Sequence, residues 1–369
     1  MSEASSGARL RWATEEDNEA LIDLVRQCPM QGDFHLFFDR SPDYFALSRI
    51  QGAGARVAVI EASEPGRLAA AAALASYPHC HVNGQVLPAF YACDLRVAPD
   101  QRRKGYVRRL HDFLTEWGVS QGGALGFMAV LAQNRAMDSI LGGQQGRHIY
   151  RPVGTMANFT VQFLLPRRAI PGITIRRATE RDVPEMVELW NRVNGAKQFA
   201  PRWSEKHVTA AIEQAPGLAL DQYWLAYRQS RLVGLCATWD QSSFKRMTVL
   251  GYGPTIRRIR PWYNLVSSGL GLAPIPQPGA LLNYFYVTQI CAETPRDLRA
   301  LYTAIYNENR KKGYHFFDTM LDRQDPLISA LNGFMAPSVD IRLFAMDPLE
   351  RFGDQPLDSR PAYFDPSTV

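Results

Sequence analysis

The sequence predicts an α/β (α+β) protein built as two tandem copies of one fold. The first observation is a repeat: residues 175–182, IRRATERD, match residues 10–17, LRWATEED, at five of eight positions. The second is that β-prone apolar runs alternate with helical periodicity in both parts of the chain. The third is a stretch with two prolines and a glycine, residues 166–172, which stands directly before the repeat. A chain of 369 residues is also long enough for two domains.

Composition and charge narrow the class of protein. A net charge of +5 suits anionic ligands but is too small for a typical nucleic-acid binder, so we expect no nucleic-acid partner. The five cysteines are odd in number and scattered, which predicts reduced thiols and a cytoplasmic location. The longest apolar run, residues 68–74, is too short to cross a bilayer, and the N-terminus has no signal-peptide pattern. We therefore expect no membrane partner.

The first copy begins with a short strand and a helix. Thr14 is a typical N-cap residue, and Asp17 stands at the capping-box position three residues later. Asn83 and Gly84 predict a two-residue hairpin turn, because both residues tolerate positive φ. The strands expected before and after this turn are residues 56–61, 67–82 and 85–97.

Residues 89–121 combine three segments with different properties. An apolar strand, residues 89–97, is followed by a loop with three consecutive basic residues, 102–104, and then by a helix that starts near Gly105. The helix is expected from the spacing of Val107, Leu110, Leu114 and Trp117. The first N–H groups of a helix lack intrahelical partners, and the helix dipole favours negative charge there. A glycine at this point also lets a ligand approach the backbone, so the stretch predicts a phosphate-binding turn.

This stretch resembles motif A of the GCN5-related N-acetyltransferase (GNAT) superfamily. In that motif a strand ending in Val is followed by Arg/Gln-x-x-Gly-x-Gly/Ala at the head of a helix. Here the strand ends in residues 95–97, LRV, and the helix start is residues 102–107, RRKGYV. Val107 stands where the family usually has Gly or Ala. Valine's larger side chain narrows the space for a phosphate at this turn, but the backbone N–H of residue 107 is still available.

A second match follows the strand expected at residues 124–132. Members of the superfamily often have an Asn just after this strand, which contacts the pantetheine arm, and an Ala two residues later; Asn134 and Ala136 fit. The family then commonly places near position 141 a Tyr that protonates the leaving thiolate. This chain has Leu141, so the acid is missing or comes from elsewhere.

The resemblance implies a fold, a co-substrate and a set of contact residues. Each copy should have a mixed, mostly antiparallel central sheet flanked by helices. The co-substrate should be acetyl-CoA or another acyl-CoA, with no metal. The fourth strand should bulge at residues 95–97 and bond the pantetheine arm. The residues carried over as cofactor-binding are Leu95, Arg96, Val97, Arg102, Arg103, Lys104, Gly105, Tyr106, Val107, Arg108 and Asn134.

Acyl transfer to an amine also needs proton transfer. Asp94 on the fourth strand is the candidate base for the attacking amine, and a structural carboxylate is the alternative. Tyr150 is a candidate acid, because Leu141 cannot donate a proton. His79 and His81 share one face of a strand, but no third ligand stands nearby, so we do not expect a metal site.

The second copy repeats the elements of the first without the phosphate-binding turn. Its strand, helix, strand and short final helix are expected at residues 281–292, 296–312, 314–321 and 325–333. Glu293 and Asp297 bring negative charge to the place where a phosphate would lie, and no glycine stands at the helix start. We expect this copy to lack a cofactor site. Its long insertion, residues 242–279, is either a solvated loop or a flap over the acceptor site of the first copy.

The predicted division of the chain follows from these features. We expect a disordered tail, a first domain with the acyl-CoA site, a linker, a second domain and a C-terminal tail. Their residues are 1–7, 8–165, 166–172, 173–347 and 348–369, in that order.

These observations predict an acyl-CoA-dependent N-acetyltransferase. The first copy would catalyse transfer, and the second would shape a pocket for a small-molecule or peptide amine. Acceptor choice is expected to depend on the aromatic loop region at residues 29–44, which would wall the site or pack under a lid, and on the insertion after Ser242. The alternative is a non-catalytic acyl-CoA-binding or sensing protein, which the missing tyrosine at position 141 favours. A third hypothesis is a transferase that uses a longer acyl chain or a charged tRNA, although the modest net charge argues against tRNA.

Overall fold

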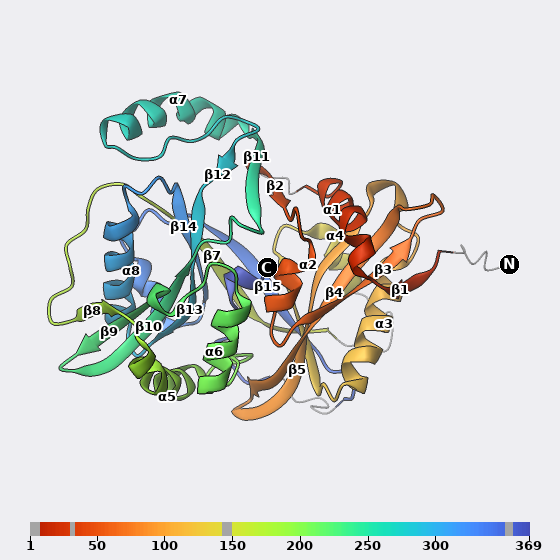
Figure 1. Ribbon diagram of the computed structural model, residues 1–369, viewed down its shortest axis with the longest axis horizontal. Coiled ribbons are helices and arrows are strands. Elements are labelled where there is room, and N and C mark those ends of the chain that lie inside the picture. The colour runs from red at the N-terminus through yellow and green to blue at the C-terminus, as the bar shows by residue number, and fades with distance from the viewer. Residues whose placement is uncertain (1–7, 30–33, 142–149, 351–356) are drawn as a thin grey trace.

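A computed structural model describes residues 8–29, 34–141, 150–350 and 357–369. The tail expected at residues 1–7 lies outside the described residues. One long sheet runs through the molecule with helices packed on it, and the end of the chain lies near the middle of the molecule (Figure 1). None of the helices in the described part of the chain combines the length and apolarity needed to cross a bilayer.

Twelve strands form the main sheet. Those from the first half are β1 (Leu10–Trp12), β3 (Ala55–Glu61), β4 (Leu68–Val82), β5 (Gln85–Val97), β6 (Leu125–Leu131) and β7 (Tyr150–Gln162). Those from the second half are β8 (Thr174–Arg177), β9 (Tyr223–Arg228), β10 (Arg231–Trp239), β13 (Tyr284–Ala292), β14 (Phe316–Asp322) and β15 (Ser338–Met346). Their order is β1-β3-β4-β5-β6-β15-β7-β14-β13-β10-β9-β8. Every neighbouring pair is antiparallel except β5 with β6 and β13 with β14, which confirms the mixed, mostly antiparallel sheet.

The two halves exchange their last strands. β7 belongs to the first half but pairs with β14 of the second, and β15 belongs to the second half but pairs with β6 of the first. β7 and β15 pair with each other between them. Residues 150–162 therefore form one long strand, not a local hairpin, because both partners of β7 come from the other half.

Most helices pack on this sheet, and α3 and α8 bury the faces that their periodicity predicts. The α-helices are α1 (Asn18–Arg26), α2 (Phe45–Ile50), α3 (Tyr106–Ser120), α4 (Arg135–Leu141), α5 (Val183–Asn194), α6 (Glu205–Gln214), α7 (Pro254–Gly269) and α8 (Pro295–Asn309). Short 3-10 helices lie at Glu15–Asp17, Pro99–Gln101, Glu180–Asp182, Leu220–Gln222, Pro326–Leu331 and Pro366–Thr368. α3 buries Leu110 and Leu114 against the sheet, and α8 buries Leu298 and Leu301 at the matching place in the second half.

The repeated sequence forms the same local structure twice. The backbone N–H of Thr14 donates to Oδ2 of Asp17 at 2.8 Å, and the backbone N–H of Thr179 donates to Oδ2 of Asp182 at 2.8 Å. In both copies the aspartate also accepts two hydrogen bonds from an arginine on the preceding strand. These arginines are Arg11 and Arg176. The predicted capping box at Thr14 is confirmed, and the repeat is structural as well as sequential.

A second, smaller sheet joins the two segments that were expected to shape the acceptor site. It contains β2 (Phe34–Asp39), β11 (Arg246–Tyr252) and β12 (Leu281–Leu282) in the order β12-β11-β2. β2 pairs antiparallel with β11, and Nη2 of Arg246 donates to Oδ2 of Asp39 at 2.6 Å. The loop expected at residues 29–44 is therefore wrong over β2. Its partner strand lies about two hundred residues later in the sequence, where a local pattern cannot reveal it.

Residues 357–369 pack between the two halves. The ring of Phe364 lies 5.1 Å from that of Tyr91, and Oδ2 of Asp365 accepts a hydrogen bond from the backbone N–H of Gln289 at 3.1 Å. The backbone oxygen of Ser367 accepts from Nε2 of Gln241 at 3.0 Å. The last residues therefore contact strands of both copies and help to line the cavity described below.

Candidate active site

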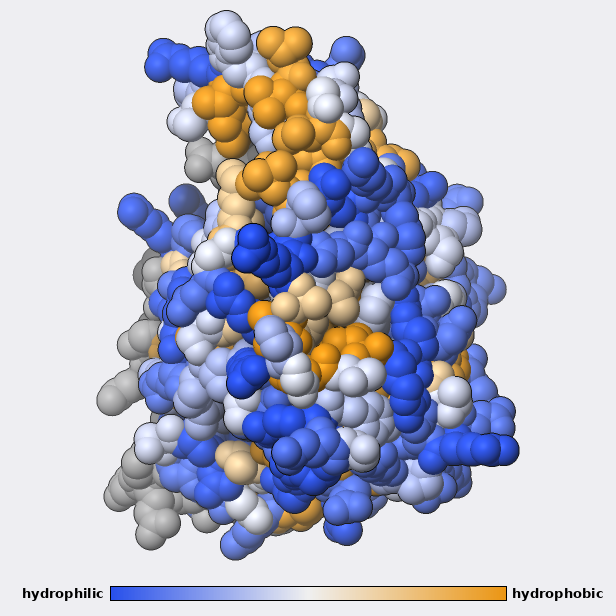
Figure 2. All heavy atoms as spheres, turned by 90° about the vertical axis from the view of Figure 1, so that its left-hand side faces the viewer, coloured by the Kyte–Doolittle hydropathy of each residue, from blue (hydrophilic) through white to orange (hydrophobic). Residues whose placement is uncertain are grey.

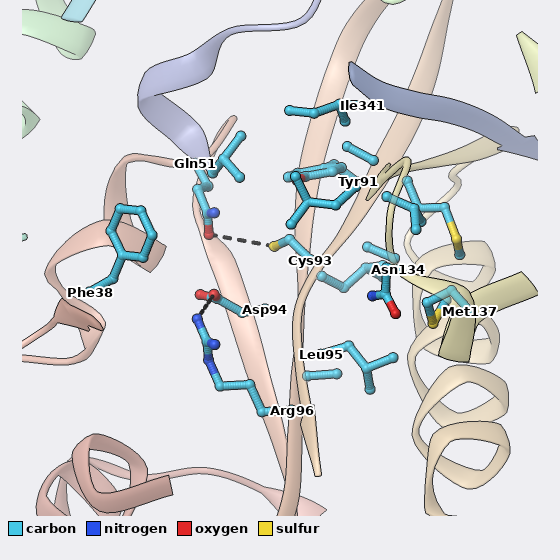
Figure 3. Close-up of a pocket in the computed structure, with 18 of the residues that line it drawn as sticks. Phe38, Gln51, Tyr91, Cys93, Asp94, Leu95, Arg96, Asn134, Met137 and Ile341 are labelled. Carbon is cyan, nitrogen blue, oxygen red and sulfur yellow. Dashed lines mark hydrogen bonds and ion pairs between the residues drawn. The ribbon is translucent and has the colours of Figure 1, made fainter. Parts of the chain in front are cut away.

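A cavity of about 370 Å³ lies where β5 and β6 meet the small sheet (Figure 3). Of the residues predicted to bind the cofactor or catalyse transfer, six line it: Asp94, Leu95, Arg96, Val107, Asn134 and Tyr150. Figure 3 shows Asp94 and Cys93 turned toward Phe38 and Gln51, whereas Asn134 lies beside Leu95 on the other side of β5. The cavity therefore has two arms, which we call the Asn134 arm and the Asp94 arm.

The cavity opens because the two parallel strands separate. β5 pairs with β6 only from Ala89 to Ala92, so the backbone groups that follow on β5 have no partner on β6. On its other edge β5 bulges against β4, and Asp94 has a φ of 52°. The bulge lies at Asp94–Leu95, one residue before the expected 95–97, since aspartate tolerates this left-handed conformation better than most residues do. Unpaired donors and acceptors thus face the cavity.

The predicted phosphate-binding turn stands open to solvent beside the Asn134 arm. Gly105 has a φ of 76° and is the N-cap of α3, which has no side-chain capping bond. A side chain added at this glycine would meet nothing within 4 Å at its Cβ. Tyr106 is buried in the core, so only its backbone can reach a ligand, while Val107 lines the cavity. The first turn of α3 therefore offers free N–H groups next to the cavity.

The basic side chains around this turn are exposed. Nζ of Lys104 is bonded to Oε1 of Gln101 at 2.8 Å, and Nε of Arg108 lies 3.7 Å from Oδ2 of Asp112. Arg102 and Arg103 lie on the surface, and Val97 belongs to the ladder between β4 and β5. None of these five residues lines the cavity itself. The positive charges of the exposed lysine and arginines suit phosphate groups that project toward solvent.

The corresponding helix start in the second half is closed by its own side chains. The hydroxyl of Thr294, the N-cap of α8, accepts from the backbone N–H of Asp297 at 3.3 Å and donates to Oδ2 of Asp297 at 2.6 Å. The carboxylate of Asp297 is fully buried. Glu293 beside it forms an ion pair with Arg231, in which Nη2 of Arg231 lies 2.5 Å from Oε2 of Glu293. Two carboxylates thus occupy the positive end of this helix, where a phosphate would meet like charge.

Asp94 is held by two arginines. Arg40 approaches Oδ2 at 3.1 Å and Arg96 approaches Oδ1 at 3.3 Å, with the Arg40 and Asp94 side chains almost fully buried. Burial alone would raise the pKa of Asp94, but the charges of Arg40 and Arg96 outweigh it and lower that pKa below its ordinary value. The carboxylate stays ionised at neutral pH and accepts protons poorly. This geometry favours a structural role in which the ion pairs fix the bulge.

Tyr150 is held as a neutral phenol in the cavity wall. Its ring stacks edge-on against His111 of α3 at 5.4 Å between centroids. Burial, assisted by the negative charge of Asp112, raises the pKa of Tyr150 to about 12. The hydroxyl therefore keeps its proton at neutral pH and can donate it to a base that forms nearby.

The structure adds two ionisable residues that the sequence did not single out as catalytic. Lys245 and Asp318 line the cavity and are 2% and 6% exposed. Burial, with the charge of Arg40, lowers the pKa of Lys245 to about 7, and burial raises the pKa of Asp318 to about 6. Nζ of Lys245 lies 4.9 Å from the centre of the Tyr286 ring and donates to the backbone oxygen of Val369. Both groups can exchange protons near neutral pH.

One of these residues left a signal in the sequence. Asp318 interrupts an apolar strand, β14, in which every residue is buried, and a carboxylate in such a run is costly unless it has a function or a partner. Here Oγ1 of Thr160, from the exchanged strand β7, donates to Oδ1 of Asp318 at 2.9 Å. Lys245 gave no such signal in the sequence, because the direction of its side chain depends on the pairing of β2 with β11.

No group of three His, Cys, Asp or Glu side chains in the part of the chain that the structure describes is arranged to hold a metal ion. The pair His79 and His81 is therefore not completed by a third ligand from those residues.

Comparison with known proteins relates part of the chain to a family and the fold to solved structures. Residues 18–139 match the model of the acetyltransferase (GNAT) family. The chain is similar to Saccharomyces cerevisiae N-myristoyltransferase with bound myristoyl-CoA (11% identity, TM-score 0.60), covering 94% of this chain and 80% of that one. It is similar to a probable N-acyltransferase from Enterococcus faecalis V583 (12%, TM-score 0.51; 94% and 74% covered).

It is also similar to a GCN5-related N-acetyltransferase from Sphaerobacter thermophilus (15%, TM-score 0.50; 85% and 83% covered). At these identities the likeness concerns the fold alone. A search of curated proteins found no match.

Proposed function

Because residues 18–139 match the model of the acetyltransferase (GNAT) family, we propose that the protein is an acyl-CoA-dependent N-acyltransferase. One observation carries the proposal: the unpaired edge of β5 and the uncapped start of α3 lie at the same cavity. The first can bond an extended amide chain and the second a diphosphate, and acyl-CoA contains both in this order.

The donor would occupy the Asn134 arm. Backbone groups of Leu95, Arg96 and Val97 would bond the pantetheine amides, with the side chain of Asn134 opposite them. The N–H groups from Gly105 to Arg108 would hold the diphosphate. The side chains of Arg102, Arg103, Lys104 and Arg108 would meet phosphate oxygens near the surface. Acetyl-CoA is the donor that we propose first.

The acceptor amine would enter through the Asp94 arm, between the small sheet and the second half. Its nitrogen attacks the thioester carbon, and the C–S bond breaks. The amine proton passes to the cavity pair of Lys245 and Asp318, either of which can accept it near neutral pH. Tyr150 donates its proton to the thiolate that leaves, and solvent restores it. Asp94, the base expected from the sequence, is assigned instead to holding the bulge with Arg40 and Arg96.

We further propose that the chain divides into copies at residues 8–165 and 173–347 and that only the first binds acyl-CoA. The filled start of α8 supports this, since Thr294 and Asp297 occupy the place where a diphosphate would lie. The second copy would instead supply Lys245 and Asp318 to the acceptor side.

The function is tested by thiol release. Purified protein with acetyl-, octanoyl- or myristoyl-CoA and a panel of small amines and peptide N-termini should release CoA faster than donor alone. Calorimetry should detect one acyl-CoA site per chain. Tight binding without amine-dependent CoA release would support an acyl-CoA sensor, and absence of binding would contradict both functions.

Tyr150→Phe should separate donor binding from chemistry. The variant keeps the ring and its contact with His111 but loses the proton, so kcat should fall about 100-fold while KM for acyl-CoA changes little. Tyr314→Phe is the matched control, because burial also raises the pKa of Tyr314 to about 12 although it does not line the cavity. Equal kcat values in the two variants would remove Tyr150 from the mechanism. Steady-state kinetics with saturating acceptor measures both.

A further inference from the structure

Helix α7 presents an apolar face to solvent. Ile259, Trp262, Leu265 and Val266 are 48%, 73%, 68% and 60% exposed. They stand at spacings of three, three and one, so they share one side of the helix. The helix stands away from the body of the molecule (Figure 1), and Figure 2 shows apolar residues gathered on this projection. Exposed apolar residues gathered in this way mark an interaction surface.

The orientation of α7 is fixed by polar contacts on its inner side. Nε of Arg260 and Nδ2 of Asn264 both donate to the backbone oxygen of Ile275, at 3.1 and 3.0 Å. The backbone N–H of Ile275 donates back to Oδ1 of Asn264 at 2.8 Å. Polar groups thus tie the helix to the segment that follows it. The helix is turned the opposite way from an ordinary surface helix, whose apolar side faces the core.

The segment that carries α7 has basic residues and no acidic ones. Residues 253–280 contain three arginines and no Asp or Glu, in a chain that has 36 acidic residues. Two of the arginines, Arg257 and Arg258, are exposed on the first turns of α7. An anionic surface would therefore meet attraction at this segment without repulsion from a carboxylate.

These features together select one partner. A second copy of the chain would bring the same positive charge, and four large side chains are few for a stable interface, which takes about 20 to 30 residues on each side. A peptide would need a groove, whereas this face is convex. A bilayer surface requires only an apolar stripe with Trp and flanking arginines.

We propose that α7 docks this protein on an anionic lipid bilayer. The helix, about 24 Å long at 1.5 Å per residue, lies flat in the interface. Trp262, Leu265 and Val266 enter the boundary between headgroups and acyl chains, and Arg257 and Arg258 contact lipid phosphates. We expected no membrane partner because the sequence has no apolar run long enough to span a bilayer. A helix that lies in the interface needs no such run.

Docking would also position the cavity. β11 runs directly from Lys245 and Met247, which line the cavity, to the start of α7. The helix is thus connected to the acceptor side through a single strand, and the cavity stays close to the bilayer when α7 is docked.

Co-sedimentation with vesicles tests the proposal. The protein should bind vesicles of phosphatidylcholine with phosphatidylglycerol at least about tenfold better than vesicles of phosphatidylcholine alone, and high salt should weaken binding. The double variant Trp262→Ser/Leu265→Ser should lose binding about tenfold or more. Arg257→Gln/Arg258→Gln should lose the preference for anionic lipid.

The matched control is Leu165→Ser/Met335→Ser, which removes two similarly exposed apolar side chains, 64% and 52% exposed, outside α7. It should bind vesicles like the wild type. Circular dichroism should show that all variants are folded, as expected for exposed positions. Failure to bind anionic vesicles, or equal binding by the α7 and control variants, would overturn the proposal. So would a dimer in analytical ultracentrifugation that Trp262→Ser/Leu265→Ser dissociates, because the face would then belong to a second copy.

Discussion

Gly105→Glu should reduce acyl-CoA affinity about 100-fold or more, equivalent to roughly 3 kcal/mol. The new carboxylate would stand at the positive end of α3, where we place the diphosphate, and Gly105 leaves it room to do so. Any residue other than glycine at a φ of 76° costs about 1–2 kcal/mol. The melting temperature should therefore fall by only a few degrees. Isothermal titration with CoA and a thermal melt measure the two effects.

Gly313→Glu provides the matched control. Gly313 follows α8 in the second half, has a φ of 85°, and has open space where a Cβ would stand. The substitution imposes similar backbone strain and the same charge far from α3, so CoA affinity should not change. Equal loss of affinity in both variants would mean that charge or instability, and not the turn, governs binding. Unchanged affinity in Gly105→Glu would show that the diphosphate binds elsewhere.

Asp318→Asn and Lys245→Met should each lower kcat/KM about 100-fold or more, because they remove the proton acceptors from the acceptor side of the cavity. In the wild type kcat/KM should be lost as the pH falls through about 7 to about 6, where the pair becomes protonated. This dependence should be altered in both variants. A pH profile of CoA release measures it, and Asp340→Asn, a substitution outside the cavity, should retain the wild-type profile.

The melting temperature of Lys245→Met distinguishes a catalytic role of Lys245 from a structural one. Folding lowers the pKa of Lys245 from 10.5 to about 7, so its burial penalty is complete below pH 7 and disappears as the pH rises toward 10.5. Lys245→Met should therefore melt at the same or a higher temperature than the wild type at pH 7, and the difference should shrink at higher pH. Lys197→Met should melt lower, because it leaves the buried carboxylate of Asp325, 2.7 Å away, without its partner. A lower melting temperature for Lys245→Met would indicate a structural lysine.

Local sequence patterns predicted the parts of the molecule that depend on neighbouring residues. The capping box at Thr14 and Asp17, the Asn83-Gly84 turn and the helix after Gly105 are all present, because each is determined by a few adjacent side chains. The periodic apolar residues of α3 and α8 likewise identified the buried faces of those helices. The fold class follows from these elements and their order.

Features that depend on distant partners could not be predicted. The pairing of β2 with β11 and the exchange of β7 and β15 are choices among strands that have similar local patterns. Two consequences for the candidate site follow. The bulge places Asp94 between Arg40 and Arg96. Arg40 lies far from both Asp94 and Arg96 in the sequence. Lys245 reaches the cavity only because β11 joins β2.

The exchange of β7 and β15 has a consequence for how the two halves can change over time. Two copies that complete each other's sheets correspond to a strand-swapped dimer fused into one polypeptide, and the fusion keeps the effective concentration of the complementary strands high. Substitutions in one half that change its exchanged strand therefore also affect the sheet of the other half. A substitution that shifts β15 moves Ile341, which stands in the second half of the chain and lines the cavity beside residues of the first half. The second half is thus an inseparable part of the wall of the candidate site, although we propose that only the first half binds acyl-CoA.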